Sequence, residues 1–227
     1  FVKVKNFVSM RLGVVVTFKL FLHKNKNMRT LFTLLLLIQL NFGFGQSKFD
    51  ASAVAKFQKE LNAEYADAKT SPLTAEDLAE FKTLDFYPIA EKFFVTAKFV
   101  RTKKEKPFEM KTSTERKPMY VKYGELFFTI DGLDFKLNVY KNIELSKKKG
   151  YEDHLFLPFS DLTCGTESYL GGKYIDLKIP KGNTIAIDFN ISYNPYCAYN
   201  HKYSCPIVPL ENDLNIEIKA GVKKFHD

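Results

Sequence analysis

The sequence contains no tryptophan, only three cysteines and only four histidines, and it lacks the common catalytic signatures. It has no Gly-x-Ser-x-Gly motif, no His-Glu-x-x-His motif, no phosphate-binding glycine loop and no dinucleotide fingerprint. These absences exclude assignment by motif to the serine hydrolases, zinc proteases and nucleotide-binding enzymes. We therefore expect no cofactor, and whether the protein is an enzyme stays open.

Acidic residues are missing from one end of the chain, and this changes the meaning of the net charge of +8. Of the 34 lysines and arginines, seven lie in the first 45 residues, which contain no aspartate or glutamate. The remainder therefore has 27 basic and 26 acidic residues, a net charge of +1. If the first 45 residues are removed, no basic surface indicates a nucleic acid partner.

A secretory signal peptide is indicated at residues 28–45. Met28-Arg29-Thr30 forms a short positive region, residues 31–38 are an apolar run, and Gly43 and Gly45 precede a cleavage point before Gln46. The apolar run is shorter than the about 20 residues that span a bilayer. We therefore expect export to the periplasm or the extracellular space, with no transmembrane span in the mature chain.

The domain organisation follows from this leader. We expect Met28 to be the initiator and residues 1–27 to be upstream sequence that is not part of the translated protein. The alternative is a genuine long N-terminus that acts as a signal anchor. Residues 46–85 are predicted to be a helical N-terminal segment, and residues 86–227 a β-rich domain. The oligomeric state cannot be predicted.

Two helices are predicted in the N-terminal segment. Residues 47–70 place apolar side chains at helical spacing, from Val54 to Tyr65, and Ser71-Pro72 ends the pattern. Thr74 then begins a second helix in the manner of a capping box. Amphipathic helices normally bury one face, so we expect both helices to pack on the domain that follows.

Short β-rich runs fill the rest of the chain, and the clearest is a hairpin with Asp131-Gly132 as its turn. The strand at 184–189 is expected to be buried on both faces, and the alternating strand at 214–220 to be half exposed. The sequence predicts a mainly β (α+β) fold, a β-sandwich or partly open β-barrel preceded by one or two N-terminal helices. The predicted strands are 93–101, 121–130, 133–140, 154–159, 174–179, 184–189 and 214–220.

Several motifs stand out between about residues 86 and 222. They are Phe86-Tyr87-Pro88-Ile89, residues 121–126, 157–163 and 167–176, Ile187-Asp188-Phe189-Asn190, Tyr193-Asn194-Pro195, Cys197-Ala198-Tyr199, Cys205-Pro206, Pro209, Glu211-Asn212 and Ala220-Gly221. Together they resemble a bacterial family known as domain of unknown function 1684. The resemblance implies no activity, because the family has none assigned. Lys173 stands where the family prefers arginine, which puts a bidentate carboxylate contact in doubt, and Cys164 replaces a small polar residue.

Cys197 and Cys205 have three interpretations. If the protein is exported, the oxidising compartment favours a disulfide between them. Both alternatively remain thiols. The third interpretation is a metal site with His201 between them and Cys164 as a fourth ligand, although the flanking prolines argue against the helix that this spacing requires. A thiol hydrolase with His154 or His201 as base is a further hypothesis, but an oxidising compartment disfavours a reactive thiol.

Polar and aromatic side chains in two blocks, around residues 169–176 and 190–212, are the candidate binding site. The aromatic platform consists of Tyr169, Tyr193, Tyr196, Tyr199 and Tyr203. Carboxylates at turns and strand ends, including Asp176, could perform hydrolysis, although such residues more often fix loops. The predicted ligand-binding residues are Asp161, Glu167, Tyr169, Lys173, Asn190, Tyr193, Asn194, Tyr199, Glu211 and Asn212.

Two functions are predicted from these residues. The leading one is a binding or interaction domain for a small molecule or a glycan, with a polar-aromatic pocket. The alternative is a hydrolase of a glycan or an ester that uses Asp161, Glu167 or Glu211. The ligand cannot be named from the sequence. The two functions differ in whether a bound molecule is also turned over.

Overall fold

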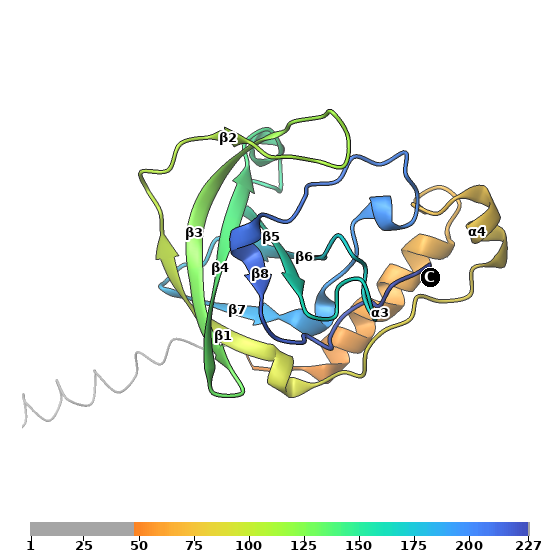
Figure 1. The fold of residues 1–227 in the computed structure, drawn as a ribbon, viewed down its shortest axis with the longest axis horizontal. Coiled ribbons are helices and arrows are strands. Elements are labelled where there is room, and N and C mark those ends of the chain that lie inside the picture. Colours follow the sequence, from red (N-terminus) through yellow and green to blue (C-terminus); the bar gives the residue numbers. More distant parts are fainter. Residues whose placement is uncertain (1–47, 227) are drawn as a thin grey trace, which may run out of the picture. The chain divides into compact units, whose positions relative to one another are not determined.

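A single eight-stranded sheet, curled into a half-barrel, organises the chain (Figure 1). This computed structural model describes residues 48–226. The predicted mainly β class is confirmed, and the curled sheet corresponds to the partly open barrel rather than to the sandwich. The strands are β1 (Phe94–Arg101), β2 (Phe108–Glu109), β3 (Met119–Ile130), β4 (Leu133–Asn142), β5 (His154–Asp161), β6 (Lys173–Lys178), β7 (Thr184–Asp188) and β8 (Asp213–Leu214).

The strand order is β6-β5-β4-β3-β1-β7, with β2 paired to β3 and β8 paired in parallel to β5. The predicted hairpin is confirmed as β3 and β4, which Figure 1 shows as long, bent strands. Its turn residues Asp131 and Gly132 have φ angles of 50° and 79°. Positive φ at both positions matches the twist of the two strands, which is why Asp-Gly predicts this turn.

The core lies on the concave face of the sheet, where alternate side chains from every long strand meet. Leu126 and Leu137 are cross-strand partners in β3 and β4, and neither is exposed. Phe159 and Phe189 contact edge to face with ring centroids 5.1 Å apart. Alternation along each strand places one side chain in two on this face. The core continues with Ala97, Val139, Leu155, Leu157, Ile175, Ile187 and Ile218.

Both predicted helices are present. Helix α3 (Ala51–Ala66) begins at Asp50, whose carboxylate accepts from the backbone N–H groups of Ser52 and Ala53. Helix α4 (Ala75–Glu80) begins at Thr74, whose hydroxyl accepts from Asp77 N–H, as the capping pattern predicts. Helix α3 ends before the predicted residue 70, because Asp67 is extended and closes a turn.

Helix α3 packs through one residue in particular. Tyr65 is fully buried, and its ring lies edge to face against Tyr199 with centroids 4.9 Å apart. Leu73, Leu84 and Val222 complete this second, smaller apolar cluster. The predicted packing of the helices on the β-rich part is therefore confirmed. It brings the C-terminal end of α3 beside the loop that follows β7.

Two strand predictions are wrong. The strand at 184–189 is not buried on both faces: β7 is the last strand in the order, and within it only Ile187 is buried. The predicted strand at 214–220 forms ladder pairs only at Asp213–Leu214, as β8. Its alternation is real, since Leu214 and Ile218 are buried while Asn215 and Glu217 are exposed. Burial alternates there because the segment crosses the core as an irregular strap.

The predicted signal peptide and the upstream extension fall on residues outside those that the structure describes. Within residues 48–226, no helix is both long and apolar enough to cross a bilayer.

Candidate ligand-binding site

The two blocks of the candidate site meet at one cavity of about 550 Å³. We call it the aromatic cavity. Strand β6 contributes from the first block, the loop after β7 contributes from the second, and α3 and β5 complete the wall. The lining residues are Phe57, Leu61, Glu64, Tyr65, Tyr120, Leu145, Tyr151, His154, Phe156, Tyr174, Asp176, Tyr193, Pro195, Tyr196, Tyr203, Ser204, Cys205 and Pro206.

The two blocks are joined by the backbones of Tyr174 and Tyr193. The N–H of Tyr174 donates to Tyr193 O at 2.9 Å, and the N–H of Tyr193 donates to Tyr174 O at 3.0 Å. The loop after β7 thus adds one antiparallel bridge to the outer edge of β6. This edge has no strand partner in the described sheet, so the bridge satisfies backbone groups and fixes the cavity wall at once.

The aromatic rings form a continuous array across this wall. Phe156 lies edge to face with Tyr174, with centroids 4.7 Å apart and an angle of 78°. The array extends to Tyr120 on one side, at 5.8 Å from Phe156, and to Tyr193 on the other, at 6.0 Å from Tyr174. All four rings line the cavity. The cavity wall is therefore built from aromatic rings held in place by one another.

A polar group of three side chains lies beside the rings. His154 Nε2 is 2.8 Å from Asp176 Oδ1, and the Tyr193 hydroxyl donates to Asp176 Oδ2 at 2.8 Å. The antiparallel register of β5 and β6 pairs Phe156 with Asp176, which places His154 one diagonal step away. The Asp176 carboxylate is half exposed, so its oxygens can also accept from a ligand.

Helix α3 brings a second carboxylate to the cavity. The Tyr196 hydroxyl donates to Glu64 Oε1 at 2.7 Å. Burial raises the pKa of Tyr196, Tyr193 and Tyr174 above the ordinary tyrosine value. These hydroxyls therefore stay protonated and act as donors: Tyr193 and Tyr196 donate to the two carboxylates, and Tyr174 donates to the carbonyl oxygen of Pro206.

The cysteine pair lies at the cavity wall, and Cys205 lines it. Cys197 and Cys205 are free thiols in the structure, and Cys197 N–H donates to Cys205 Sγ at 3.1 Å. A hydrogen bond from the Cys205 thiol lowers the pKa of Cys197 to about 6, and the same contact raises the pKa of Cys205. The Tyr169 hydroxyl is 3.8 Å from Cys197 Sγ. A thiolate in this pair therefore forms at Cys197.

A metal centre is a further interpretation of these cysteines. Among the described residues, no group of three or more histidine, cysteine, aspartate or glutamate side chains could hold a metal ion. Cys164 instead lies in a turn, where its sulfur accepts from Asp161 N–H at 3.4 Å and from the Ser168 hydroxyl at 3.7 Å.

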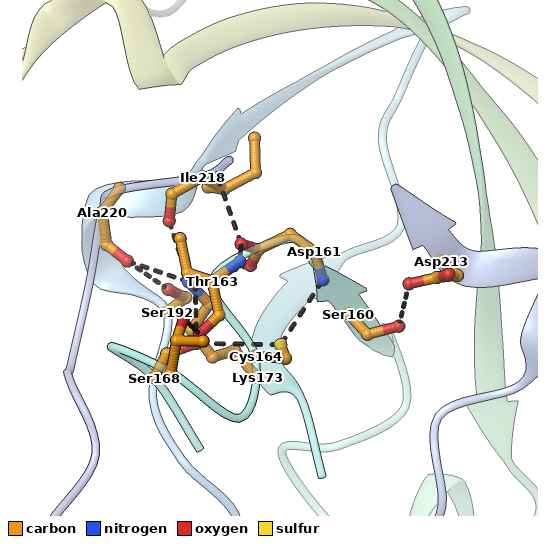
Figure 2. Close-up of polar contacts among 11 residues, drawn as sticks. Ser160, Asp161, Thr163, Cys164, Ser168, Lys173, Ser192, Asp213, Ile218 and Ala220 are labelled. Carbon is orange, nitrogen blue, oxygen red and sulfur yellow. Dashed lines mark hydrogen bonds and ion pairs between the residues drawn. The ribbon is translucent and has the colours of Figure 1, made fainter. Parts of the chain in front are cut away.

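Asp161 and Lys173, both predicted to bind a ligand, form a buried ion pair (Figure 2). Lys173 Nζ is 3.0 Å from Asp161 Oδ2, and neither side chain is exposed. Lys173 also donates to the carbonyl oxygens of Ile218 at 2.9 Å and Ala220 at 3.4 Å. Asp161 Oδ1 accepts from the N–H groups of Thr163 and Ile218. The pair attaches the C-terminal strap to the sheet.

The lysine changes the geometry of this contact. An arginine would offer a planar fork to both carboxylate oxygens, whereas the Lys173 ammonium is a point donor. The ammonium contacts Asp161 Oδ2, and backbone N–H groups donate to Asp161 Oδ1. The remaining donor capacity of Lys173 goes to the carbonyls of the strap. Neither residue lines the aromatic cavity, so the pair is separate from the candidate site.

The three candidate asparagines connect loops through their side-chain amides. Asn190 exchanges two hydrogen bonds with the backbone of Ala90. Asn194 donates to Lys223 O at 2.8 Å. Asn212 accepts from Asn138 N–H and donates to the carbonyl oxygens of Asn138 and Pro158. All three are at most 1% exposed. Such amides replace missing ladder bonds where the chain is irregular.

The other candidates lie in different surroundings. Glu167 pairs with Lys219 at 3.0 Å and lines a smaller cavity of about 330 Å³ near the C-terminus. Glu211 accepts from the Tyr140 hydroxyl at 3.2 Å, and Tyr199 packs on Tyr65. Among the ten predicted ligand-binding residues, Tyr193 alone lines the aromatic cavity. Tyr196 and Tyr203, from the predicted aromatic platform, line it too.

Sequence reasoning missed the contributions of α3, β3 and β5. Glu64 and Phe156 are ordinary members of predicted elements, Tyr120 lies one residue before the predicted strand 121–130, and no local pattern separates the three from surface or core residues. The weak signal was the apolar stripe of α3, because Leu61 belongs to it and lies three residues before Glu64, on the same helix face. Asp176 and His154 were noted separately, and only the register of β5 and β6 joins them.

Comparison with known proteins gives a family and a structural relative. A family model described as "Protein of unknown function (DUF1684)" matches residues 79–223. The solution NMR structure of an uncharacterized protein of Haloarcula marismortui, from gene locus rrnAC0354, is similar with a TM-score of 0.60 and 28% sequence identity. The match covers 76% of this chain and 92% of that chain. No curated protein matches.

Proposed function

The chain belongs to the DUF1684 family, whose description assigns no function, and we propose that it binds a small organic molecule in the aromatic cavity. The observation that carries the proposal is the cavity itself. Its volume of about 550 Å³ falls within the roughly 300–1,000 Å³ typical of small-molecule sites. Its lining combines many aromatic rings with a few polar groups, which is the composition of such sites.

The polar groups give the cavity directional contacts. Asp176 is oriented by His154 and Tyr193, and Glu64 is oriented by Tyr196. Because these carboxylates are held by neighbours, a ligand that binds them does not have to immobilise them. The arrangement supports recognition of one defined ligand. It gives less support to a surface for a large partner.

The hydrolase hypothesis has weaker support. Each proposed carboxylate already has its own partner: Asp161 pairs with Lys173, Glu167 pairs with Lys219, and Glu211 accepts from Tyr140. Of the three, Glu167 alone lines a described cavity. The two carboxylates that line the aromatic cavity are Glu64 and Asp176, and neither is one of the three proposed by this hypothesis.

We also propose that the protein is exported and that Cys197 and Cys205 form a disulfide after export. The support for export is the sequence pattern of residues 28–45. The support for the disulfide is the contact between the two cysteines, in which Cys197 N–H lies 3.1 Å from Cys205 Sγ. N-terminal sequencing of secreted protein should give Gln46 as the first residue. Any other mature start contradicts the proposed cleavage.

The binding proposal is tested with a panel of small molecules that differ in charge and include sugars. Thermal unfolding of the mature chain is measured with each molecule. Binding to the folded state raises the melting temperature by mass action. We expect at least one compound class to stabilise wild type and to lose its effect in Tyr196→Ala, which removes a ring from the cavity wall.

The matched control is Phe127→Ala. Phe127 and Tyr196 are 39% and 37% exposed, and Phe127 does not line the cavity. Its removal should leave the shift with the ligand intact. A panel that yields no stabilising compound contradicts the binding function, as does a ligand whose effect is the same in Tyr196→Ala and wild type. Turnover of a bound compound would favour the hydrolase hypothesis.

A further inference from the structure

The aromatic cavity carries charge of one sign. Glu64 and Asp176 line it, and no lysine or arginine does so among the described residues. In the same part of the chain, neither carboxylate forms an ion pair with a lysine or an arginine. Glu64 accepts from a tyrosine hydroxyl, and Asp176 accepts from another and from His154. The tyrosine hydroxyls are neutral donors, and a neutral donor orients a carboxylate without cancelling its charge.

The rings of the cavity strengthen this polarity. The face of an aromatic ring carries negative electrostatic potential, and it attracts a cation placed within about 6 Å of the centroid. Tyr174, Phe156 and Tyr120 line the cavity as a connected array of rings. The Tyr196 and Tyr203 rings, whose centroids lie 5.2 Å apart, also line it. Both components of the wall, rings and carboxylates, therefore favour positive charge.

The nearest basic side chains have their own contacts. Arg116 donates to the carbonyl oxygen of Ser204 at 2.7 Å and to its hydroxyl at 3.1 Å, so its guanidinium is held at the loop backbone. Lys202 Nζ lies 5.0 Å from the centroid of the Tyr203 ring. That contact shows one ring of the lining already accepting an ammonium group of the chain itself.

We infer that the ligand of the aromatic cavity is an organic cation, an ammonium group attached to an apolar or aromatic body. The inference rests on the proposed binding function and narrows its ligand class. The ammonium group lies against the ring faces, and Glu64 and Asp176 compensate its charge. The apolar body fills the remainder of the cavity, whose exposed lining is mainly ring and aliphatic carbon. An anionic ligand would meet two carboxylates that no lysine or arginine of the described lining neutralises.

The test compares three probes that share a benzyl or phenyl group: benzyltrimethylammonium, benzyl alcohol and phenylacetate. Their affinities for the mature chain are measured by calorimetry or by NMR titration. We expect the cation to bind about tenfold more tightly than the alcohol and the anion to bind most weakly. Raising the salt concentration should weaken the binding of the cationic probe alone, because salt screens the attraction between exposed charges.

The variant that isolates the charge is Glu64→Gln, which keeps an acceptor oxygen for Tyr196. This variant should lower the affinity for benzyltrimethylammonium by roughly threefold to tenfold, as expected for loss of one partly exposed charge. The affinity for benzyl alcohol should not change. The matched control is Glu211→Gln, because Glu211 also accepts from a tyrosine, Tyr140, but lies outside the cavity. This control should bind all three probes as wild type does.

The outcomes separate this inference from the binding function on which it rests. If alcohol and cation bind equally and Glu64→Gln changes neither, the cavity binds ligands without selecting cations, and the inference is wrong while the binding function stands. If phenylacetate binds most tightly, the inference is also wrong. If none of the three probes binds while the wider panel yields a neutral or anionic ligand, the inference is wrong and the binding function stands. If the whole panel fails, both proposals fall.

Discussion

Tyr174 and Tyr193 each donate a backbone hydrogen bond to the other, at 2.9 Å and 3.0 Å, across the outer edge of β6. This reciprocal bridge attaches the loop after β7 to the sheet. Their side chains then stand edge to face, with ring centroids 6.0 Å apart. One backbone contact thus sets the geometry of two cavity rings. It also positions the Tyr193 hydroxyl on Asp176.

The buried Asp161–Lys173 pair should be necessary for stability. Replacing Lys173 by methionine leaves the Asp161 carboxylate buried without its counter-charge, and we expect the free energy of unfolding to fall by about 3–5 kcal/mol. Urea denaturation measures the change. The matched control is Lys219→Met, whose partner pair is about half exposed and should contribute about 1 kcal/mol or less.

A double variant separates charge from packing at this pair. Lys173→Met combined with Asp161→Asn removes the stranded charge while keeping an acceptor for the backbone of Thr163 and Ile218. It should be more stable than Lys173→Met alone. Equal losses for Lys173→Met and Lys219→Met would show that the burial of the pair has no energetic consequence.

Asn212 should be a structural residue. Its amide makes three hydrogen bonds to the backbone of Asn138 and Pro158, and it is fully buried. Asn212→Ala leaves those backbone groups unsatisfied and should lower the free energy of unfolding by roughly 2–4 kcal/mol. The exposed Asn215→Ala is the control and should change it by less than about 0.5 kcal/mol. A selective loss of ligand binding at full stability would instead assign Asn212 to the site.

The proposed disulfide can be read directly by mass spectrometry. When secreted protein is alkylated without prior reduction, Cys197 and Cys205 should stay unlabelled while Cys164 is labelled after unfolding. Closing this short loop should raise the free energy of unfolding by about 2–3 kcal/mol over the reduced protein. Cys197→Ser should remove the difference between oxidising and reducing conditions. Labels on both cysteines of native secreted protein would contradict the bridge.

The reduced protein should carry its thiolate at Cys197. The hydrogen bond from the Cys205 thiol lowers the pKa of Cys197 to about 6, below the ordinary cysteine value. Because the group is an acid with a depressed pKa, it is a thiol below about pH 6 and a thiolate above it. The ultraviolet absorbance of the thiolate should rise through that pH and should lose this step in Cys197→Ser. A first step only above pH 8 would place the charge elsewhere.

The parts of the fold that were predicted have local causes. The turn at Asp131-Gly132 and the helix start at Thr74 depend on residues adjacent in the sequence. The errors concern features that depend on the whole sheet. The sequence of β7 is apolar on both faces, yet β7 is the last strand in the order and only Ile187 within it is buried. Residues 214–220 alternate because the strap crosses the core, which no local pattern distinguishes from a strand.

The site was predicted in part for the same reason. The loop after β7 stands out because polar and aromatic residues are dense there, and it does line the cavity through Tyr193, Tyr196 and Tyr203. Its partners come from contacts between distant segments, such as the hydrogen bond between Tyr196 and Glu64. Lys173 and Asn212 were predicted to bind a ligand, but their polar side chains form hydrogen bonds with backbone groups of irregular segments. The sequence alone does not distinguish a polar residue with that structural role from one that binds a ligand.

Helix α3 supplies one wall of the aromatic cavity, and it precedes the segment that defines the family, residues 79–223. The cavity therefore draws its walls from both inside and outside the matched segment. A relative that shares only the matched segment has the sheet and loop walls but not Glu64. Such a relative would keep the ring array and the position of Asp176, while the second charge of the cavity would depend on the segment before the match. Exchange of N-terminal segments between relatives would then change the ligand without any change in the sheet.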